Sequence, residues 1–290
     1  MTAQALILIT LAAVLHASWN LLTKRAAKAG TFFVFTYRVW SVIFYLPWVI
    51  YIANQGVSWS LLTVFLLFLS TVLHLLYSLA LMWGYQSGDL SVVYPVARGT
   101  GPLIASFIAI VFWGEPLTIG KAAGILAIAL GIFTIASGGE WRIFANRSMW
   151  PGIKWGLIIG TVIAAYSLSD AYAVKIALIA PVLLDWVTSL GGAVMLAPRV
   201  WATKSNYKNT MKGLWWPAAI VGLASPMAYI LVLYALQLGA HVSQVAPLRE
   251  VSMVVATIMG AIILKESVGK ARWIGCITTL AGVLFIALTS

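Results

Sequence analysis

The chain has 290 residues, of which 62% are hydrophobic and only 9% are charged. Because soluble globular proteins carry roughly a quarter charged residues, this composition excludes a water-soluble domain and indicates that lipid covers most of the surface. The formal net charge of +11 does not require a nucleic-acid partner, since the basic residues of membrane proteins gather in loops on one side of the bilayer.

Long apolar runs, separated by charged or Gly/Pro/Asn-rich breaks, predict ten membrane-spanning helices, because about 20 apolar residues cross the hydrocarbon core. They are expected near residues 4–23, 31–53, 59–85, 91–113, 119–138, 153–174, 181–201, 214–238, 243–264 and 271–289. The alternating pattern of an outer-membrane barrel is missing. No Lys or Arg precedes Lys24, so we expect the first run to be retained as a helix rather than cleaved as a signal peptide.

The loops predict the orientation of these helices. Arg38, Arg98 and Arg249 lie inside predicted spans, which leaves 15 of the 18 basic residues in loops. Thirteen of these fall on one side, and only Lys121 and Lys175 fall on the other. The positive-inside rule assigns the basic side to the cytoplasm. We therefore expect a multi-pass protein of the cell inner membrane with both termini on the non-cytoplasmic side.

The second half of the chain repeats the first at a nearly constant offset. The offset is 152 for Tyr77 and Tyr229, Ser91 and Ser243, and Pro95 and Pro247, and it is 151 for Glu115 and Glu266, Gly124 and Gly275, and Gly131 and Gly282. Five helices per half invert the second half relative to the first, as in many secondary transporters. We predict a first repeat over 1–139, a connecting loop over 140–152 and a second repeat over 153–290.

Two stretches and their repeat partners carry a family resemblance. They are Ala80 to Pro95 (ALMWGYQSGDLSVVYP) with Val232 to Pro247, and GEPLTIGKAAGILAIALGI with KESVGKARWIGCITTLAGV. These segments resemble the ten-helix EamA-type branch of the drug/metabolite transporter superfamily, and HASWN at 16–20 resembles, more weakly, a subgroup associated with phosphonate utilisation. The resemblance implies an all-α integral membrane protein that exports amino acids or other small metabolites. That family is usually drawn with cytoplasmic termini, against the charge count here, and we follow the count.

Three charged residues near the repeat-related prolines are the first candidates for a substrate site. Arg98 and Arg249 follow Pro95 and Pro247 by three and two residues, and proline loosens a helix by removing a backbone donor. A guanidinium at the repeat interface suits a carboxylate or phosphonate. Glu250 lies about 100° around the helix from Arg249, so we do not expect it to neutralise Arg249 on one face. Structural pairing of embedded charges is the alternative.

Polar stripes on otherwise apolar spans supply further candidates. His74 and Tyr77 share one helix face, and so do His16 and Asn20 with Trp19 beside them; at an offset of 150, Tyr166 and Asp170 repeat the latter pair. Interhelical hydrogen bonding is the alternative role. The complete set of predicted substrate-binding residues is Arg98, Arg249, Glu250, His74, Tyr77, Tyr229, His16, Trp19, Asn20, Tyr94, Tyr166 and Asp170.

These features predict a secondary transporter that moves a small polar or charged organic metabolite by alternating access, with export favoured over uptake. The expected partners are the solute, the lipid bilayer and a proton or second solute for coupling, without nucleic acid, and the protein is expected to be a monomer or homodimer. No nucleotide, metal-ligand or nucleophile–base motif occurs, so we expect no cofactor, no metal and no enzyme activity. The alternatives are uptake of an anionic phosphonate-type solute and a membrane-embedded lipid-modifying enzyme, whose acidic groups would come from Asp89, Glu115, Glu140 and Glu266.

Overall fold

The computed structural model is an all-helical bundle, and it describes residues 1–87, 90–140, 142, 147–263 and 268–289. Its long helices are α1 (Ala3–Arg25), α2 (Gly30–Asn54), α3 (Leu61–Ser87), α4 (Leu90–Phe112), α5 (Ile119–Ser137), α6 (Trp150–Lys175), α7 (Pro181–Ala202), α9 (Trp215–Gln237), α11 (Val251–Ile263) and α12 (Lys270–Leu288). Two helices are short: α8 (Lys204–Thr210) connects α7 to α9, and α10 (Val242–Leu248) precedes α11.

Nine of the ten predicted spans are single helices, and the ninth predicted span is divided. Within the described ranges, nine helices are long and apolar enough to cross a membrane. The expected continuous helix over 243–264 is instead α10 and α11, which are separated by a turn at Arg249 and Glu250. The all-α fold with ten crossings is therefore confirmed, and the continuity of the ninth crossing was wrongly predicted.

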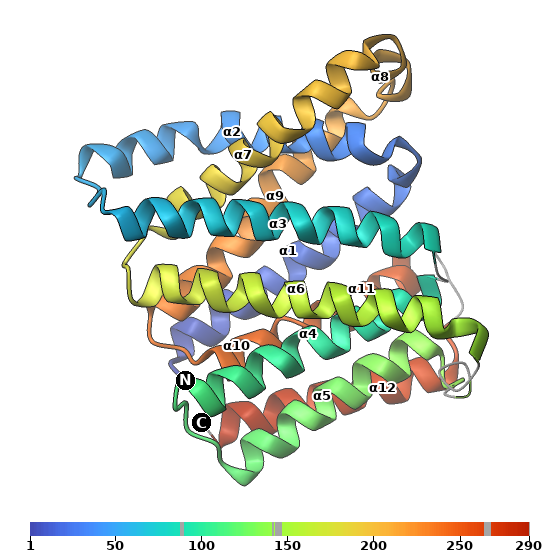
Figure 1. Cartoon of the computed structure of the whole chain (residues 1–290). Helices are drawn as coiled ribbons and strands as arrows, with labels where there is room; N and C mark the ends of the chain where they lie inside the picture. Colours follow the sequence, from blue (N-terminus) through green and yellow to red (C-terminus); the bar gives the residue numbers. More distant parts are fainter. Residues whose placement is uncertain (88–89, 141, 143–146, 264–267, 290) are drawn as a thin grey trace.

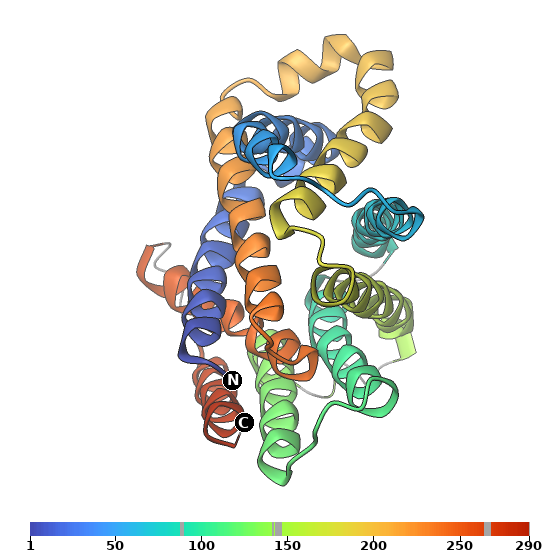
Figure 2. The ribbon, with the colours of Figure 1, turned by 90° about the vertical axis from the view of Figure 1, so that its left-hand side faces the viewer.

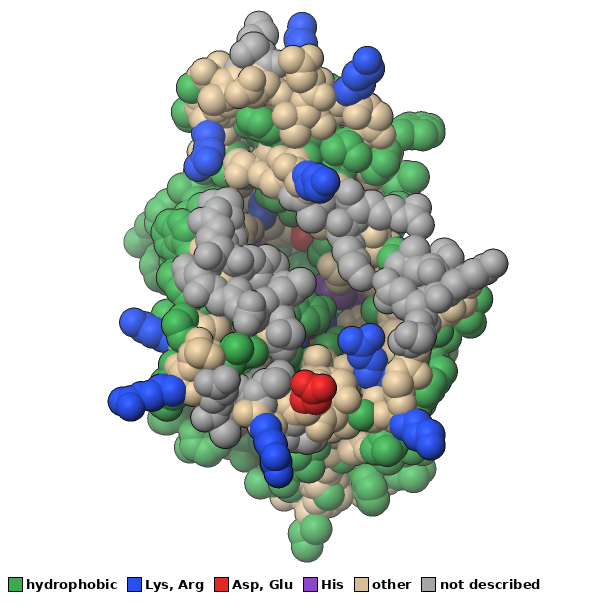
Figure 3. All heavy atoms as spheres, turned by 90° about the vertical axis from the view of Figure 1, so that its right-hand side faces the viewer, with side chains coloured by type: hydrophobic (Ala, Val, Ile, Leu, Met, Phe, Trp, Pro, Cys, Tyr) green, Lys and Arg blue, Asp and Glu red, His purple; other side chains and the backbone are tan. Residues whose placement is uncertain are grey.

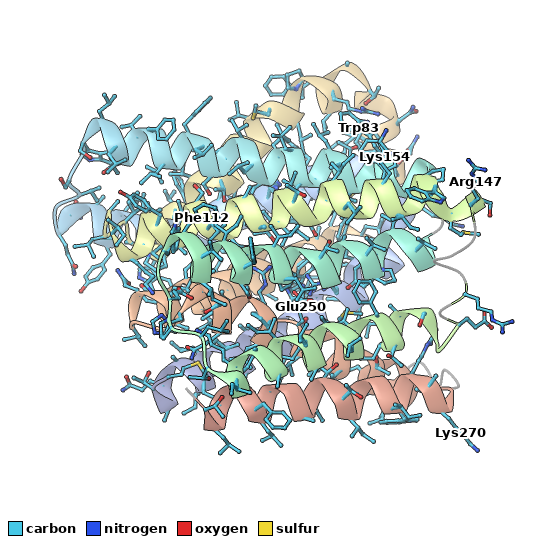
Figure 4. All side chains as sticks on the ribbon, turned by 60° about the horizontal axis from the view of Figure 1, so that its bottom comes forward. Trp83, Phe112, Arg147, Lys154, Glu250 and Lys270 are labelled. Atoms are coloured by element: carbon cyan, nitrogen blue, oxygen red, sulfur yellow. The ribbon has the colours of Figure 1, made fainter. Side chains whose placement is uncertain are left out.

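The spans run side by side between two ends of the bundle, and both termini lie at the same end (Figures 1 and 2). Arg147, Lys154 and Lys270 lie at the opposite end, while Glu250 lies between the two ends (Figure 4). We call these the termini end and the basic end. Large apolar side chains such as Phe68 and Leu126 are more than half exposed, as expected for a surface that faces lipid.

Helix packing follows the inverted repeat. α1 packs on α9 in the same way that its repeat partner α6 packs on α3, while α2 packs on α7 and α5 packs on α12. Each of the last two contacts joins a helix to its own repeat partner, so a two-fold axis passes through both. Pro95 and Pro247 are each the sixth residue of their helix, α4 and α10. Glu266, the repeat partner of Glu115, lies outside the described residues, as does part of the predicted 140–152 connection.

The repeat-related glycines lie at the contact between α5 and α12. A Cβ atom added to Gly131 would lie 2.7 Å from the carbonyl oxygen of Gly275, and one added to Gly275 would lie 2.8 Å from that of Gly131. The other two glycines repeat this arrangement, with distances of 2.7 Å for Gly124 and 2.6 Å for Gly282. Only glycine allows two backbones to approach this closely. The pairing of 124 with 282 and of 131 with 275 is the pairing that an inverted repeat requires.

The ninth crossing breaks two residues after Pro247. Proline has no N–H, so the carbonyl of Ser243, four residues earlier, loses its helical donor. The hydroxyl of Ser106 in α4 donates to that carbonyl instead, at 3.4 Å. The next turn closes with shorter-range bonds, in which Glu250 N–H donates to Pro247 O at 3.0 Å. α4 remains helical through Pro95 and Pro102, so the two repeats differ here.

Candidate functional site

Two arginines, one from each repeat, converge on a single carboxylate. Arg98 Nε in α4 lies 2.8 Å from Glu250 Oε2, and Arg249 Nε lies 3.9 Å from Glu250 Oε1. All three side chains are at least 93% buried. We call Arg98, Arg249 and Glu250 the arginine cluster. Its formal charge is +1, because Arg remains protonated at any physiological pH.

The contacts of Glu250 correct one expectation. A continuous helix would direct Glu250 away from Arg249, but the turn between α10 and α11 allows the carboxylate to approach both guanidinium groups. The nearer partner is Arg98, at 2.8 Å. Arg249 is thus the less neutralised of the two arginines.

The remaining contacts of the arginines are weaker and come mainly from aromatic side chains. Arg98 donates to the Ser252 hydroxyl at 3.2 Å, and Arg249 donates to the Tyr166 hydroxyl at 3.4 Å. The guanidinium carbon of Arg98 lies 6.0 Å from the Tyr94 ring centre, and that of Arg249 lies 5.9 Å from the Tyr166 ring centre. A tyrosine from each repeat therefore faces an arginine at the range of a cation–π contact.

A second polar group, His74, Asp170 and Tyr229, joins three helices. His74 Nε2 in α3 lies 2.9 Å from Asp170 Oδ2 in α6, and the hydroxyl of Tyr229 in α9 donates to the same oxygen at 2.6 Å. Asp170 has no exposed surface, while the His74 side chain is 17% exposed. We call these three residues the carboxylate cluster.

Tyr166 connects the two clusters. Its hydroxyl accepts the bond from Arg249, and its ring centre lies 4.4 Å from that of His74. Tyr77 and Tyr229 pack against the same ring, at 5.7 and 6.2 Å between ring centres. The predicted residues of α3, α4, α6 and α9 thus form one continuous polar and aromatic region.

The predicted face of α1 joins this region through His16. The charges of Arg98 and Arg249 both act on His16, and the edge of the Trp19 ring packs on His16 with 4.8 Å between ring centres. Trp19 also packs on an apolar group that includes Phe33, and Asn20 is half-buried. At the repeat offset of 150, His16 corresponds to Tyr166, which contacts Arg249.

The predicted set missed three residues next to these clusters. Ser252 binds Arg98, but its repeat counterpart is Gly101, so the repeat offered no signal for it. Arg38 donates to the carbonyl of Thr188 at 3.0 Å, and Asp185 lies within electrostatic range of Arg38, His74 and Asp170. Arg38 and Asp185 are both charges inside predicted spans, which is the signal that identifies them.

The bundle is hollowed at the basic end. Figure 3 views this end and shows a central depression, in which a histidine and an acidic side chain are visible, on a face that carries several Lys and Arg side chains. Ser167, Tyr229 and Arg249 line a recess together with apolar residues of α9 and α10. Tyr229 and Arg249, one from each cluster, thus border a small recess that is distinct from this depression, because Val242 and Val245, which also line it, lie in α10, which begins at the termini end.

At the termini end, Glu115, in the loop after α4, contacts the first residues of α10. Its carboxylate accepts the backbone N–H groups of Val242 and Ser243, at 2.8 and 2.9 Å, and also the Ser243 hydroxyl. It thereby caps the N-terminus of α10, where a negative charge is favoured. Lys121 and Lys175, the two basic residues predicted on this side, donate to the carbonyls of Pro116 and Ala240 at 2.8 Å each.

This fold and this buried polar region define a class, the multi-pass membrane transport proteins built from inverted repeats. The model of the EamA-like transporter family matches residues 3–137 and 150–288. The chain belongs to this family, and it is a membrane transporter of the drug/metabolite transporter superfamily. The two matched segments confirm the two-repeat architecture, while the limits 1–139, 140–152 and 153–290 remain predictions.

Other comparisons show the fold alone. A crystal structure of a protein without a stated function matches with a TM-score of 0.74 and 16% sequence identity, over 100% of this chain and 98% of the other. Twenty-eight solved chains match significantly in structure. No curated protein matches significantly.

Proposed function

We propose that the protein is a secondary transporter of a small organic metabolite that carries an anionic group, and that the arginine cluster binds this group. The observation that carries the proposal is the unequal sharing of Glu250, which is 2.8 Å from Arg98 and 3.9 Å from Arg249. The positive charge of Arg249 is therefore compensated less than that of Arg98. A carboxylate or phosphonate is the natural partner of its planar fork.

The surrounding residues support a binding role. Tyr166, Tyr77, Tyr94 and Tyr229 would contact the organic part of the solute, and His16 would approach it from α1. Trp19 and Asn20, further along α1, remain predicted contacts. Alternating access would close the basic end and open the termini end around this fixed site.

We also propose an inner-membrane orientation with the basic end in the cytoplasm. Of the 15 loop Lys and Arg residues, the two at the termini end, Lys121 and Lys175, are held by backbone carbonyls. Both carbonyls, those of Pro116 and Ala240, lie outside the helices. The 13-to-2 distribution of the loop Lys and Arg residues supports this orientation.

A binding screen tests the site. The purified protein is heated in detergent with simple carboxylates, alkylphosphonates, amino acids, amines or nucleosides. We expect a carboxylate or phosphonate to raise the melting temperature, and Arg249→Gln to abolish the rise. The exposed Arg199 at the end of α7 provides the matched control, Arg199→Gln. Stabilisation by amines alone, or equal stabilisation of Arg249→Gln, would contradict the proposed site.

A further inference from the structure

The carboxylate cluster has a vacant hydrogen-bonding position that the proposed anion site does not use. Both donors to Asp170, from His74 and Tyr229, meet the same oxygen, Oδ2. Within the described part of the chain, no hydrogen-bond donor reaches Oδ1, although this atom is buried. A buried carboxylate oxygen without a donor costs free energy unless a ligand satisfies it.

The charges around this cluster leave a deficit of one positive charge. Asp185 in α7 interacts electrostatically with Asp170, His74 and Arg38. Arg38 donates to Thr188 O at 3.0 Å and to the Ser78 hydroxyl at 3.4 Å. With neutral His74, these residues carry two negative charges and one positive charge. Among the described residues, Tyr45 interacts electrostatically with Asp185, Tyr166 and Tyr229 pack on His74, and Tyr77, Tyr94, Arg98 and Arg249 lie in the next layer around Tyr166 and Tyr229.

A proton suits this deficit better than a metal ion. Oδ2 of Asp170 already accepts two bonds, and no group of three His, Cys, Asp or Glu side chains that could hold a metal occurs among the described residues. A proton needs no coordination shell. His74 is the side chain in the cluster whose ordinary pKa lies near neutrality, and its 17% exposure lets water reach it.

We infer that the His74–Asp170 pair binds and releases one proton in each transport cycle, and that this proton couples solute movement to a proton gradient. The proton leaves water and bonds to the imidazole or to the carboxylate, which changes the charge of the pair from −1 to 0. It returns to water when the other end of the bundle opens. No other bond forms or breaks.

Tyr166 provides the link to the anion site. It packs on His74 with 4.4 Å between ring centres and accepts a bond from Arg249 at 3.4 Å. A proton on the pair makes the potential at Arg249 more positive, so proton binding and anion binding favour each other, and linkage makes the effect reciprocal. This coupling step rests on the proposed function, whereas proton binding does not.

A pH-jump measurement without any organic solute tests proton binding by itself. The protein is reconstituted on a solid-supported membrane, and the current after a rapid pH step is recorded. A proton that moves to a buried site displaces charge through the membrane field, while surface protonation displaces little. We expect a transient current from the wild type that His74→Gln and Asp170→Asn lose. His241→Gln, a change in a 38% exposed histidine at the termini end, should keep it.

Two results would overturn the inference. One is an undiminished current in monodisperse His74→Gln and Asp170→Asn proteins, and the other is an equal current from a Na⁺ step at constant pH. Should both variants aggregate, Tyr229→Phe decides, because it removes one donor to Asp170 without a charge; the midpoint pH of the current should change, and an unchanged midpoint contradicts the proton site. Failure of the solute screen together with a His74-dependent current would reject the anion site alone.

Discussion

Arg98 in α4 and Glu250 in the break between α10 and α11 form an ion pair of 2.8 Å that joins the two repeats. Both side chains are at least 93% buried, so each charge depends on the other for compensation. Arg249, the repeat partner of Arg98, stands 3.9 Å from the second oxygen of the same carboxylate. Arg98 therefore has the shorter ion pair with Glu250, and Arg249 is the less neutralised of the two arginines.

This difference predicts that substitution of Arg98 costs more stability than substitution of Arg249. Arg98→Gln should lower the stability of the protein by about 3–5 kcal/mol, the usual cost of leaving one member of a buried pair uncompensated. Arg249→Gln should cost less, because Arg98 still neutralises Glu250. Thermal unfolding in detergent measures both changes.

The double variant Arg98→Gln/Glu250→Gln is the control for this prediction. It removes both charges, so its stability should exceed that of Arg98→Gln alone. Equal destabilisation by Arg98→Gln and Arg249→Gln, with no recovery in the double variant, would show that Glu250 does not pair preferentially with Arg98.

The helix contact between α5 and α12 predicts an effect far from the site. A Cβ at Gly131 would lie 2.7 Å from the Gly275 carbonyl oxygen, so Gly131→Ala must separate the two helices. We expect a loss of about 1–3 kcal/mol, as for other overpacked interiors, seen as a lower melting temperature. Gly269→Ala is the control, since no atom of the described residues beyond its chain neighbours lies within 4 Å of its added Cβ, and it should melt like the wild type. Normal stability of Gly131→Ala would refute the close contact.

The bonds from α10 to Glu115 predict that this residue affects how often the termini end opens. Glu115→Gln keeps the size of the side chain but removes the negative charge of the carboxylate. This carboxylate accepts three hydrogen bonds from Val242 and Ser243. We expect the closed termini end to open more often. A cysteine replacing Ser167 in the recess, in a Cys276→Ser background, should then react faster with an impermeant thiol reagent applied from that end.

Glu140→Gln, a change in an exposed acidic residue, should leave the labelling rate of that cysteine unchanged. The role of Glu115 in closure would be disproved by labelling of Glu115→Gln at the wild-type rate.

The loop charges predict the orientation in the cell. A reporter that is active only outside the cytoplasm, fused after Ser290, should be active, because both termini share one end of the bundle and the basic loops lie at the other. Activity of a cytoplasm-specific reporter at the same position would show that the basic end faces outward.

Much of this architecture is predictable from the sequence because hydrophobicity and repetition report on it directly. The ten crossings follow from apolar runs, and Gly124, Gly131, Gly275 and Gly282 identify the repeat that places α5 against α12. Arg98, Arg249 and Glu250 were candidates because a charge inside an apolar run is costly. These are properties of single positions.

Two features could not be predicted from the sequence: the break between α10 and α11, and the contacts between residues of different helices. On a continuous helix, the side chains of Arg249 and Glu250 would point about 100° apart. In the structure, the turn after Pro247 brings Glu250 into contact with both arginines. The distances from Glu250 to the two arginines favour Arg249 over Arg98 as the arginine that binds a ligand. Likewise, the two hydrogen bonds to Asp170 Oδ2 come from side chains of α3 and α9. Residue spacing along the sequence does not predict which helices pack together.

The central claim is that Arg249 binds the anionic group of a transported solute. The most direct measurement is saturable transport of the best ligand from the stability screen into proteoliposomes that contain the wild type, Arg249→Gln or Arg199→Gln, with size-exclusion profiles recorded for each. The account predicts transport by the wild type and Arg199→Gln, and its loss in a monodisperse Arg249→Gln protein. Transport by Arg249→Gln at the wild-type rate and with the wild-type affinity would contradict it.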